Sequence, residues 1–207
     1  MSQNYLFEQK ENDPQQYYWF REALTPAEVD QVIHLASELP EAQRATTIGS
    51  DDEHQHNSTR SSMIKWIPRD RNWDWLYKRL IGLAEEANRN VWDFDLTAAL
   101  ESIQYTEYYA AENGHYDWHQ DIGKGELPSK RKVSITIQLS ASDDYAGGDL
   151  LICTGSNGNG VLDNNIECPR GKGVGVLFPS YMMHRVTPVT MGIRKSLVLW
   201  VGGSHYR

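Results

Sequence analysis

The chain reads Lys132-Val133-Ser134-Ile135-Thr136-Ile137-Gln138-Leu139-Ser140 in its second half, and apolar residues stand there at every second position. Successive side chains of a β-strand point to opposite faces of the sheet, so this alternation predicts a half-buried strand. Glycine-rich turns divide the sequence around it into further short strands. These turns are Gly147-Gly148, Ser156 to Gly160 and Gly171 to Gly173.

Two segments in the first half of the chain have the helical period instead. Thr25, Pro26 and Glu28 form a typical helix start, and an apolar stripe follows as far as Pro40. Apolar residues recur at helical spacing again from Trp73 to Trp92. Helices followed by many strands predict a mainly β fold with flanking helices. The double-stranded β-helix, a jelly-roll or cupin-like sandwich, fits this order best.

The length favours a single domain over 1–207, because β-sandwiches reach 207 residues around one core. Within it we expect helical support over about 1–95 and the β-helix core over about 97–203. The segment from Met1 to Gln16 is polar, and no stretch is long and apolar enough to span a membrane. We therefore expect a soluble, cytoplasmic protein, while the sequence leaves the oligomeric state open.

Charge and cysteine content exclude some classes of function. The net charge is −8, which provides no overall positive field for a phosphate backbone, so nucleic acid is not expected as a partner. A local basic groove stays open, since Lys124 and the run from Lys130 to Lys132 lie close together in the chain. Cys153 and Cys168 are the two cysteines, and we expect free thiols rather than a bridge across a hairpin.

The first chemical signal is the run Tyr116-Asp117-Trp118-His119-Gln120-Asp121. On a strand, His119 and Asp121 point to the same face and reach one metal ion. His184, far along the chain, supplies a third ligand. Two imidazoles and one carboxylate are the ligand set of non-haem Fe(II) oxygenases, although Zn, Mn, Co and Ni accept the same donors.

Arg194 is the second signal, because it lies in an otherwise apolar strand where an unpaired charge is costly to bury. A guanidinium holds a carboxylate through two parallel hydrogen bonds, and Ser196 adds a hydroxyl on the same face. The sequence therefore predicts an anionic ligand at Arg194. A structural ion pair with a nearby Asp or Glu is the alternative.

The segment from Arg44 to Ser62 is polar and predicts an exposed loop. Long loops in compact domains are often lids, and disorder is the alternative. His54 and His56 form a further pair in this loop, but no strand fixes their separation, so we do not expect them to bind the metal.

In their order along the chain, these motifs resemble the 2-oxoglutarate- and Fe(II)-dependent oxygenases of the prolyl 4-hydroxylase-like family. The resemblance covers Arg60 to Gly203 and rests on several motifs in sequence. They are the pair His119/Asp121, Tyr145 to Leu150, Gly173 to Pro179, His184 to Val189 and Gly192 to Leu197.

The resemblance implies a dioxygenase that hydroxylates a prolyl residue of a protein or peptide and decarboxylates 2-oxoglutarate to succinate. It implies Fe(II) on the catalytic residues His119, Asp121 and His184, with O2 as the oxidant and ascorbate as a reductant. Arg194 stands ten residues after His184, where the family has the basic residue that binds the far carboxylate of 2-oxoglutarate. A tyrosine of the preceding strand adds a hydrogen bond in that family. The best match is Tyr108, with Tyr105 or Tyr109 in its place if the strand parity differs.

Residues on the substrate side are also candidates. Arg60, Ser62, Ile64 and Trp66 fit one face of a strand near the pocket mouth. Trp66, Tyr116 and Trp118 either form an aromatic seat for a prolyl ring or fill the core.

Other functions stay open at this level. In one alternative, the same hydroxylation chemistry acts on a free amino acid, another small molecule or a nucleobase. A cupin-like protein that binds a metal or ligand without oxygen chemistry is a second, and a catalytically silent interaction module is a third.

Overall fold

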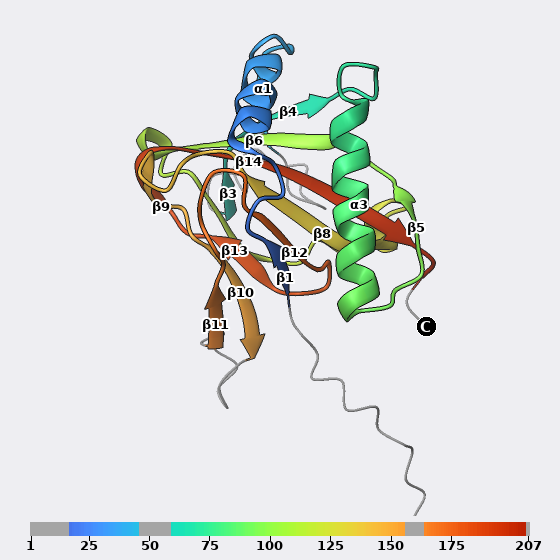
Figure 1. Cartoon of the computed structure of the whole chain (residues 1–207). Helices are drawn as coiled ribbons and strands as arrows, with labels where there is room; N and C mark the ends of the chain where they lie inside the picture. Colours follow the sequence, from blue (N-terminus) through green and yellow to red (C-terminus); the bar gives the residue numbers. More distant parts are fainter. Residues whose placement is uncertain (1–16, 46–58, 156–163, 206–207) are drawn as a thin grey trace, which may run out of the picture.

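The computed structural model describes residues 17–45, 59–155 and 164–205, and Figure 1 shows their arrangement. The described α-helices are α1 (Pro26–Ser37) and α3 (Asp74–Val91). The strands before α3 are β1 (Tyr18–Phe20), β2 (Gln43–Arg44), β3 (Arg60–Ser61) and β4 (Met63–Ile67). Those after it are β5 (Leu96–Ala99), β6 (Ile103–Tyr109), β7 (His115–His119), β8 (Arg131–Gln138), β9 (Tyr145–Gly147), β10 (Leu150–Gly155), β11 (Asn164–Glu167), β12 (Gly175–Pro179), β13 (His184–Val186) and β14 (Val189–Gly203).

Both helices form where the periodicity predicts them. Thr25 caps α1 reciprocally: its hydroxyl accepts from the Glu28 main-chain N–H, and the Glu28 carboxylate accepts from the Thr25 main-chain N–H at 2.8 Å. Such a capping box satisfies two N–H groups that the first turn leaves unpaired. Apolar residues on one face of α3 are buried, among them Leu76, Leu80 and Ala84.

The strands form two antiparallel sheets, as a double-stranded β-helix requires, so the predicted fold is confirmed. The larger sheet has nine strands in the order β1-β12-β8-β14-β6-β4-β2, with β5 and β9 also paired to β14. The smaller sheet has five strands in the order β11-β10-β13-β7-β3. Strands β1 to β4 precede residue 95 and join both sheets, so this part of the chain supplies strands as well as helices.

Apolar side chains gather in two layers. The helix-side core joins α1 and α3 to one face of β6, β8 and β14, the face that the helices cover in Figure 1. The inter-sheet core lies on the opposite face and includes Tyr108, Ile152, Phe178 and Val186. The larger sheet is therefore covered on both faces, and polar side chains of its inner face lie inside the protein.

Strand β8 shows this directly and corrects one prediction. All eight of its residues are buried, so it is not half-buried. Val133, Ile135 and Ile137 pack in the helix-side core, whereas Ser134 and Thr136 lie on the other face. Period-two alternation distinguishes the two faces of a strand, but it does not tell water from a polar interior.

The turn at Gly147 and Gly148 depends on glycine, because both residues have positive φ, at 67° and 64°. A Cβ on Gly147 would lie 2.1 Å from the Pro188 carbonyl oxygen. Cys153 and Cys168 are both buried and unbridged, which confirms the predicted free thiols. Within the described ranges, no helix has the length and apolar character needed to cross a membrane.

Candidate active site

His119 and His184 lie opposite each other on neighbouring strands of the smaller sheet, at the end of β7 and the start of β13. Asp121 lies beside both, with Oδ1 3.7 Å from His119 Nε2 and Oδ2 3.5 Å from His184 Nε2. One ligand atom of each residue lies within 4.8 Å of the others, so this triad can hold one metal ion.

Asp121 reaches the triad by a different route from the predicted one. Strand β7 ends at His119, and Asp121 lies beyond it, where its main-chain N–H donates to the Ser180 carbonyl at 2.9 Å. The Ser134 hydroxyl, on β8, donates to Asp121 Oδ2 at 2.6 Å. The larger sheet therefore positions the carboxylate, whereas the smaller sheet positions both imidazoles.

Main-chain carbonyls orient the two imidazoles. His119 Nδ1 lies 2.7 Å from the Asp117 carbonyl oxygen, and His184 Nδ1 lies 2.9 Å from that of Met182. A carbonyl only accepts, so each Nδ1 carries a hydrogen, and in the neutral imidazole the lone pair is then on Nε2. This outer hydrogen bond is the usual partner of a metal-binding histidine.

Ionisation also favours metal binding. Burial, with the neighbouring His184, lowers the pKa of His119 to about 3, although Asp121 opposes the shift. Burial alone would raise the pKa of Asp121, but His184, His119 and the Ser134 hydrogen bond together lower it to about 2. Near neutral pH His119 is therefore uncharged and Asp121 is ionised, which are the forms that bind metals.

Arg194 lies in the same interior, on β14, and is 1% exposed. Its Nη1 donates to Ser196 Oγ at 3.3 Å, while Nε and Nη2 are buried without a hydrogen-bond partner. The structure places no carboxylate in an ion pair with Arg194 among the residues it describes. Two unpaired N–H donors of one guanidinium match the two oxygens of a carboxylate, so the site fits an anionic ligand.

Strand register separates the three candidate tyrosines. Tyr108 is the register partner of Arg194, and the guanidinium lies 5.3 Å from its ring centroid. Tyr105 packs in the helix-side core, on the other face of β6. Tyr105 and Tyr109 both donate their hydroxyls to Glu107. The structure therefore brings Tyr108, Ser196 and Arg194 together, and we call them the arginine cluster.

A cavity of about 240 Å³ opens beside Asp121. Arg60, Ile64 and Trp66 line it as predicted, with Tyr116, whereas the fourth predicted residue, Ser62, does not; Trp66 is 41% exposed. The Tyr116 ring stacks on His119 with centroids 3.4 Å apart. Trp118 does not line the cavity: it lies under the Arg185 guanidinium at 4.8 Å, so its predicted place in the aromatic seat is wrong.

Two lining residues, Glu101 and Arg131, form an ion pair that sequence reasoning missed. Arg131 donates to both oxygens of Glu101, at 2.6 and 2.5 Å, and stacks over Trp200 at 3.8 Å. Its Nη1 also donates to the Asp121 carbonyl at 3.0 Å. Of the basic residues from Lys130 to Lys132 and Lys124, only Arg131 lines this cavity. The sequence shows that Arg131 directly precedes the alternating residues of β8, but it does not show that Glu101, 30 residues earlier, is the ion-pair partner of Arg131.

The predicted loop from Arg44 to Ser62 is not exposed at its C-terminal end. Arg60, Ser61 and Ser62 are buried, because β3 pairs with β7 and Arg60 Nη2 donates to Gln104 Oε1 at 2.9 Å. Residues 46–58, including His54 and His56, lie outside the described residues, and with them the lid prediction.

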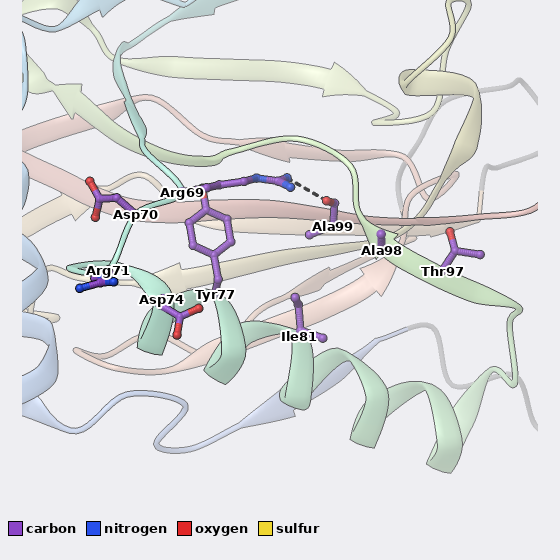
Figure 2. A pocket seen from close by; sticks show the side chains of 9 residues that line it. All are labelled: Arg69, Asp70, Arg71, Asp74, Tyr77, Ile81, Thr97, Ala98 and Ala99. Carbon is purple, nitrogen blue, oxygen red and sulfur yellow. Dashed lines mark hydrogen bonds between the residues drawn. The ribbon is translucent and has the colours of Figure 1, made fainter.

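A larger hollow of about 610 Å³ lies elsewhere, between the start of α3 and β5, and Figure 2 shows its lining. It contains none of the predicted site residues and no histidine or cysteine. Arg69 crosses it to donate to the Ala99 and Glu101 carbonyls at 2.8 and 2.7 Å. Within the described structure, Arg69 therefore holds the main chain that carries Glu101 in place.

Comparison with known proteins shows that the chain is similar to oxygenases. Residues 103–202 match the model of the 2OG-Fe(II) oxygenase superfamily. The chain is similar to a PKHD-type hydroxylase of Teredinibacter turnerae, 37% identical over 112 residues, which is 51% of this chain and 46% of the relative. It is 28% identical over 185 residues to one of Azoarcus sp., which is 87% of this chain and 75% of the relative. With three such relatives the match spans only 39%, 46% and 47% of the relative's length.

Solved structures share the fold. A prolyl hydroxylase of Trichoplax adhaerens, in complex with a hypoxia inducible factor peptide fragment, superposes with a TM-score of 0.70 at 18% identity, over 91% of this chain and 84% of that chain. A Pseudomonas putida prolyl-4-hydroxylase gives 0.65 at 20% identity, over 91% and 93%.

Proposed function

We propose that this chain, which is similar to the 2OG-Fe(II) oxygenase superfamily over residues 103–202, is an Fe(II)- and 2-oxoglutarate-dependent dioxygenase that hydroxylates a prolyl residue of a protein or peptide. One observation carries the proposal. A His-Asp-His triad, in which Asp121 and His184 are buried, and a buried arginine with two unpaired donors both border the inter-sheet core, where Tyr108 packs with Phe178 and the Phe178 ring lies 4.6 Å from that of His184. A metal-binding protein without oxygen chemistry has no need of the second feature.

Different residues bind the metal and the cosubstrate. His119, Asp121 and His184 hold Fe(II), and Ser134 keeps the carboxylate in place through its hydrogen bond. Arg194, Ser196 and Tyr108 hold the far carboxylate of 2-oxoglutarate. When bound, Fe(II), 2-oxoglutarate and O2 supply the oxidising chemistry that inserts one oxygen atom into a C–H bond of the substrate.

The cavity beside Asp121 receives the substrate residue. Trp66 and Tyr116 offer apolar surface for a prolyl ring, and Trp66 stands at the exposed mouth, where a peptide would cross. Arg60 and Arg131 lie in the wall and offer donors to peptide carbonyls. The T. adhaerens prolyl hydroxylase, which has this fold, was solved with a peptide, and this supports a peptide substrate here.

An anaerobic titration with Fe(II) and 2-oxoglutarate tests the cosubstrate. We expect the visible charge-transfer band of the chelate in the wild type and a weaker band in Arg194→Ala. Lys78→Ala, which removes an exposed cation from α3, is the matched control and should leave the band unchanged. A metal-bound protein that shows no band would contradict the proposal.

Substrate is tested separately, by release of succinate and gain of one oxygen atom in proline-containing peptides. Trp66→Ala should weaken peptide-stimulated turnover and leave 2-oxoglutarate binding intact, since Trp66 lines the cavity and not the arginine cluster. Turnover with free amino acids but with no peptide would replace the peptide substrate by a small one.

A further inference from the structure

Buried polar atoms without a partner gather around the arginine cluster. Among the unpaired buried atoms of the described residues, those near this cluster are Arg194 Nε and Nη2, Gln138 Oε1, the hydroxyl of Tyr145 and Nε of Arg170, which stacks on Tyr145. Gln138 pairs in register with Ser196, so its side chain lies on the Arg194 face of the sheet. Most buried polar groups in proteins have a partner, so a group of unpaired atoms indicates a ligand or ordered water.

Tyr145 lies against Arg194 across a glycine. A Cβ built on Gly148 would lie 3.0 Å from Arg194 Cδ and 3.2 Å from Tyr145 Cε2, so both side chains converge on this residue. Tyr145 also packs in the same inter-sheet core as Tyr108. The absence of a side chain at Gly148 therefore leaves room for the Tyr145 ring and the aliphatic part of the Arg194 side chain to pack around the same residue.

The Tyr145 ring is held in this place from its other side. The Arg170 guanidinium lies 4.3 Å from the ring centroid, and its Nη2 donates to the Tyr145 carbonyl at 3.2 Å. Its Nη1 donates to Asp149 at 2.8 Å, which fixes the arginine in turn. Tyr145 is 3% exposed, and its hydroxyl is buried.

Two other buried tyrosines have paired hydroxyls. The Tyr77 hydroxyl donates to the Ile67 carbonyl at 2.7 Å and accepts from the Ile103 N–H at 3.0 Å. The Tyr105 hydroxyl donates to Glu107. Tyr145 alone among these three carries a hydroxyl that the described residues leave unpaired. Burial of such a hydroxyl is unfavourable unless a ligand pairs with it.

We propose that Tyr145 is a further cosubstrate-binding residue, whose hydroxyl donates to the far carboxylate of 2-oxoglutarate beside Arg194 and Ser196. This inference rests on the proposed function. A carboxylate accepts several hydrogen bonds, so it can take both unpaired arginine donors and the phenol together. The site would then select 2-oxo acids with a second carboxylate over those without one.

The test is the dissociation constant of 2-oxoglutarate for the Fe(II)-loaded protein, measured anaerobically by calorimetry in wild type, Tyr145→Phe and Arg194→Ala. We expect Tyr145→Phe to bind about tenfold more weakly, the effect of one hydrogen bond to a charged group. Pyruvate, a 2-oxo acid without the second carboxylate, should bind wild type and Tyr145→Phe equally.

Tyr77→Phe is the matched control. It removes a paired hydroxyl from the helix-side core and should lower thermal stability without changing the dissociation constant. Tyr145→Phe should do the reverse, keeping the ligand-free protein as stable as wild type.

The outcomes separate the two proposals. Weaker binding in Arg194→Ala with unchanged binding in Tyr145→Phe would overturn the role of Tyr145, and its hydroxyl would then pair with water. An equal loss of pyruvate and 2-oxoglutarate affinity in Tyr145→Phe would overturn it too, because contact with the far carboxylate predicts a selective loss. No binding of 2-oxoglutarate to wild type would overturn the proposed function itself.

Discussion

The triad and the arginine cluster both border the inter-sheet core but differ in how their polar atoms are paired. At the triad, Asp121 accepts from Ser134, and both imidazoles are oriented by main-chain carbonyls. Nearby, Arg131 is neutralised by Glu101. At the arginine cluster, Arg194 has two unpaired donors and no carboxylate among the described residues.

This difference indicates two ways of preparing a site. The triad is organised by the protein alone, so a metal meets ligands that already have their orientation and protonation state. The arginine cluster lacks a counter-charge, and its anion must come from a ligand. Four predictions can break or sharpen this contrast.

The largest effect is expected from His184→Ala, which removes one of three metal ligands. Loss of an outer hydrogen-bond partner already costs roughly 10–100-fold in metal affinity, so loss of a ligand should cost more than about 100-fold. Anaerobic calorimetry with Fe(II) measures this. His34→Ala, an exposed histidine of α1, is the control. Retained affinity in His184→Ala would show that the triad is not the metal site.

Next come two arginine variants that should move stability in opposite directions. Arg131→Met leaves Glu101 buried without its partner and should lower the free energy of unfolding by about 3 kcal/mol. Arg194→Met removes a buried charge that lacks a counter-ion and should raise it by about 1 kcal/mol in ligand-free protein. Urea unfolding gives both values. Equal destabilisation would mean that Arg194 has a partner within the protein.

Ser134→Ala tests how far the protein prepares the triad. It removes the hydroxyl that donates to Asp121 and should weaken metal binding about tenfold while leaving 2-oxoglutarate selectivity unchanged. Ser129→Ala, on a surface turn, is the control. Unchanged metal affinity would make this hydrogen bond incidental to the site.

The last prediction is a pH dependence of the metal-free protein. The pKa of His119 is about 3 in the folded protein, against an ordinary value of 6.5. Below pH 6.5 the unfolded chain therefore binds a proton at His119 that the folded protein does not bind. Stability should fall as pH drops from 6.5 towards 3, by up to about 1.4 kcal/mol per pH unit. Asp121 should lower the stability further as the pH drops from 3.8 to about 2, because its pKa is lowered in the folded protein.

His119→Gln removes this titration, so its unfolding free energy should change less steeply over the same range. Urea unfolding at several pH values compares the two proteins. Identical slopes would assign the pH dependence to other groups.

Much of the fold and site could be predicted because the decisive signals are local. The Thr25 capping box and the periodicity of α3 depend on residues within a few turns of one another. The alternation of β8 shows which residues share a face. The triad was predicted from residue types that bind metal in a known order, although the predicted strand position of Asp121 was wrong.

Contacts between distant strands could not be predicted in the same way. The choice of Tyr108 over Tyr105 depends on the register of β6 against β14, and a shift of one residue would exchange their faces. Glu101 pairs with Arg131, and Tyr145 and Arg194 both pack against Gly148, across parts of the chain that no local pattern connects. Trp118 was misplaced for the same reason.

The sequence by itself determined the order of the elements, the two faces of each strand and the residue types available for chemistry, since these follow from local periodicity and from what each side chain can bind. Only the tertiary structure decided which polar residues are buried together and which of them stay unpaired. The smaller sheet is the reason, because it covers the polar face of β8 and β14 and so makes that face part of the interior. In the interior, an unpaired hydrogen-bond donor is unfavourable unless a ligand or ordered water binds it.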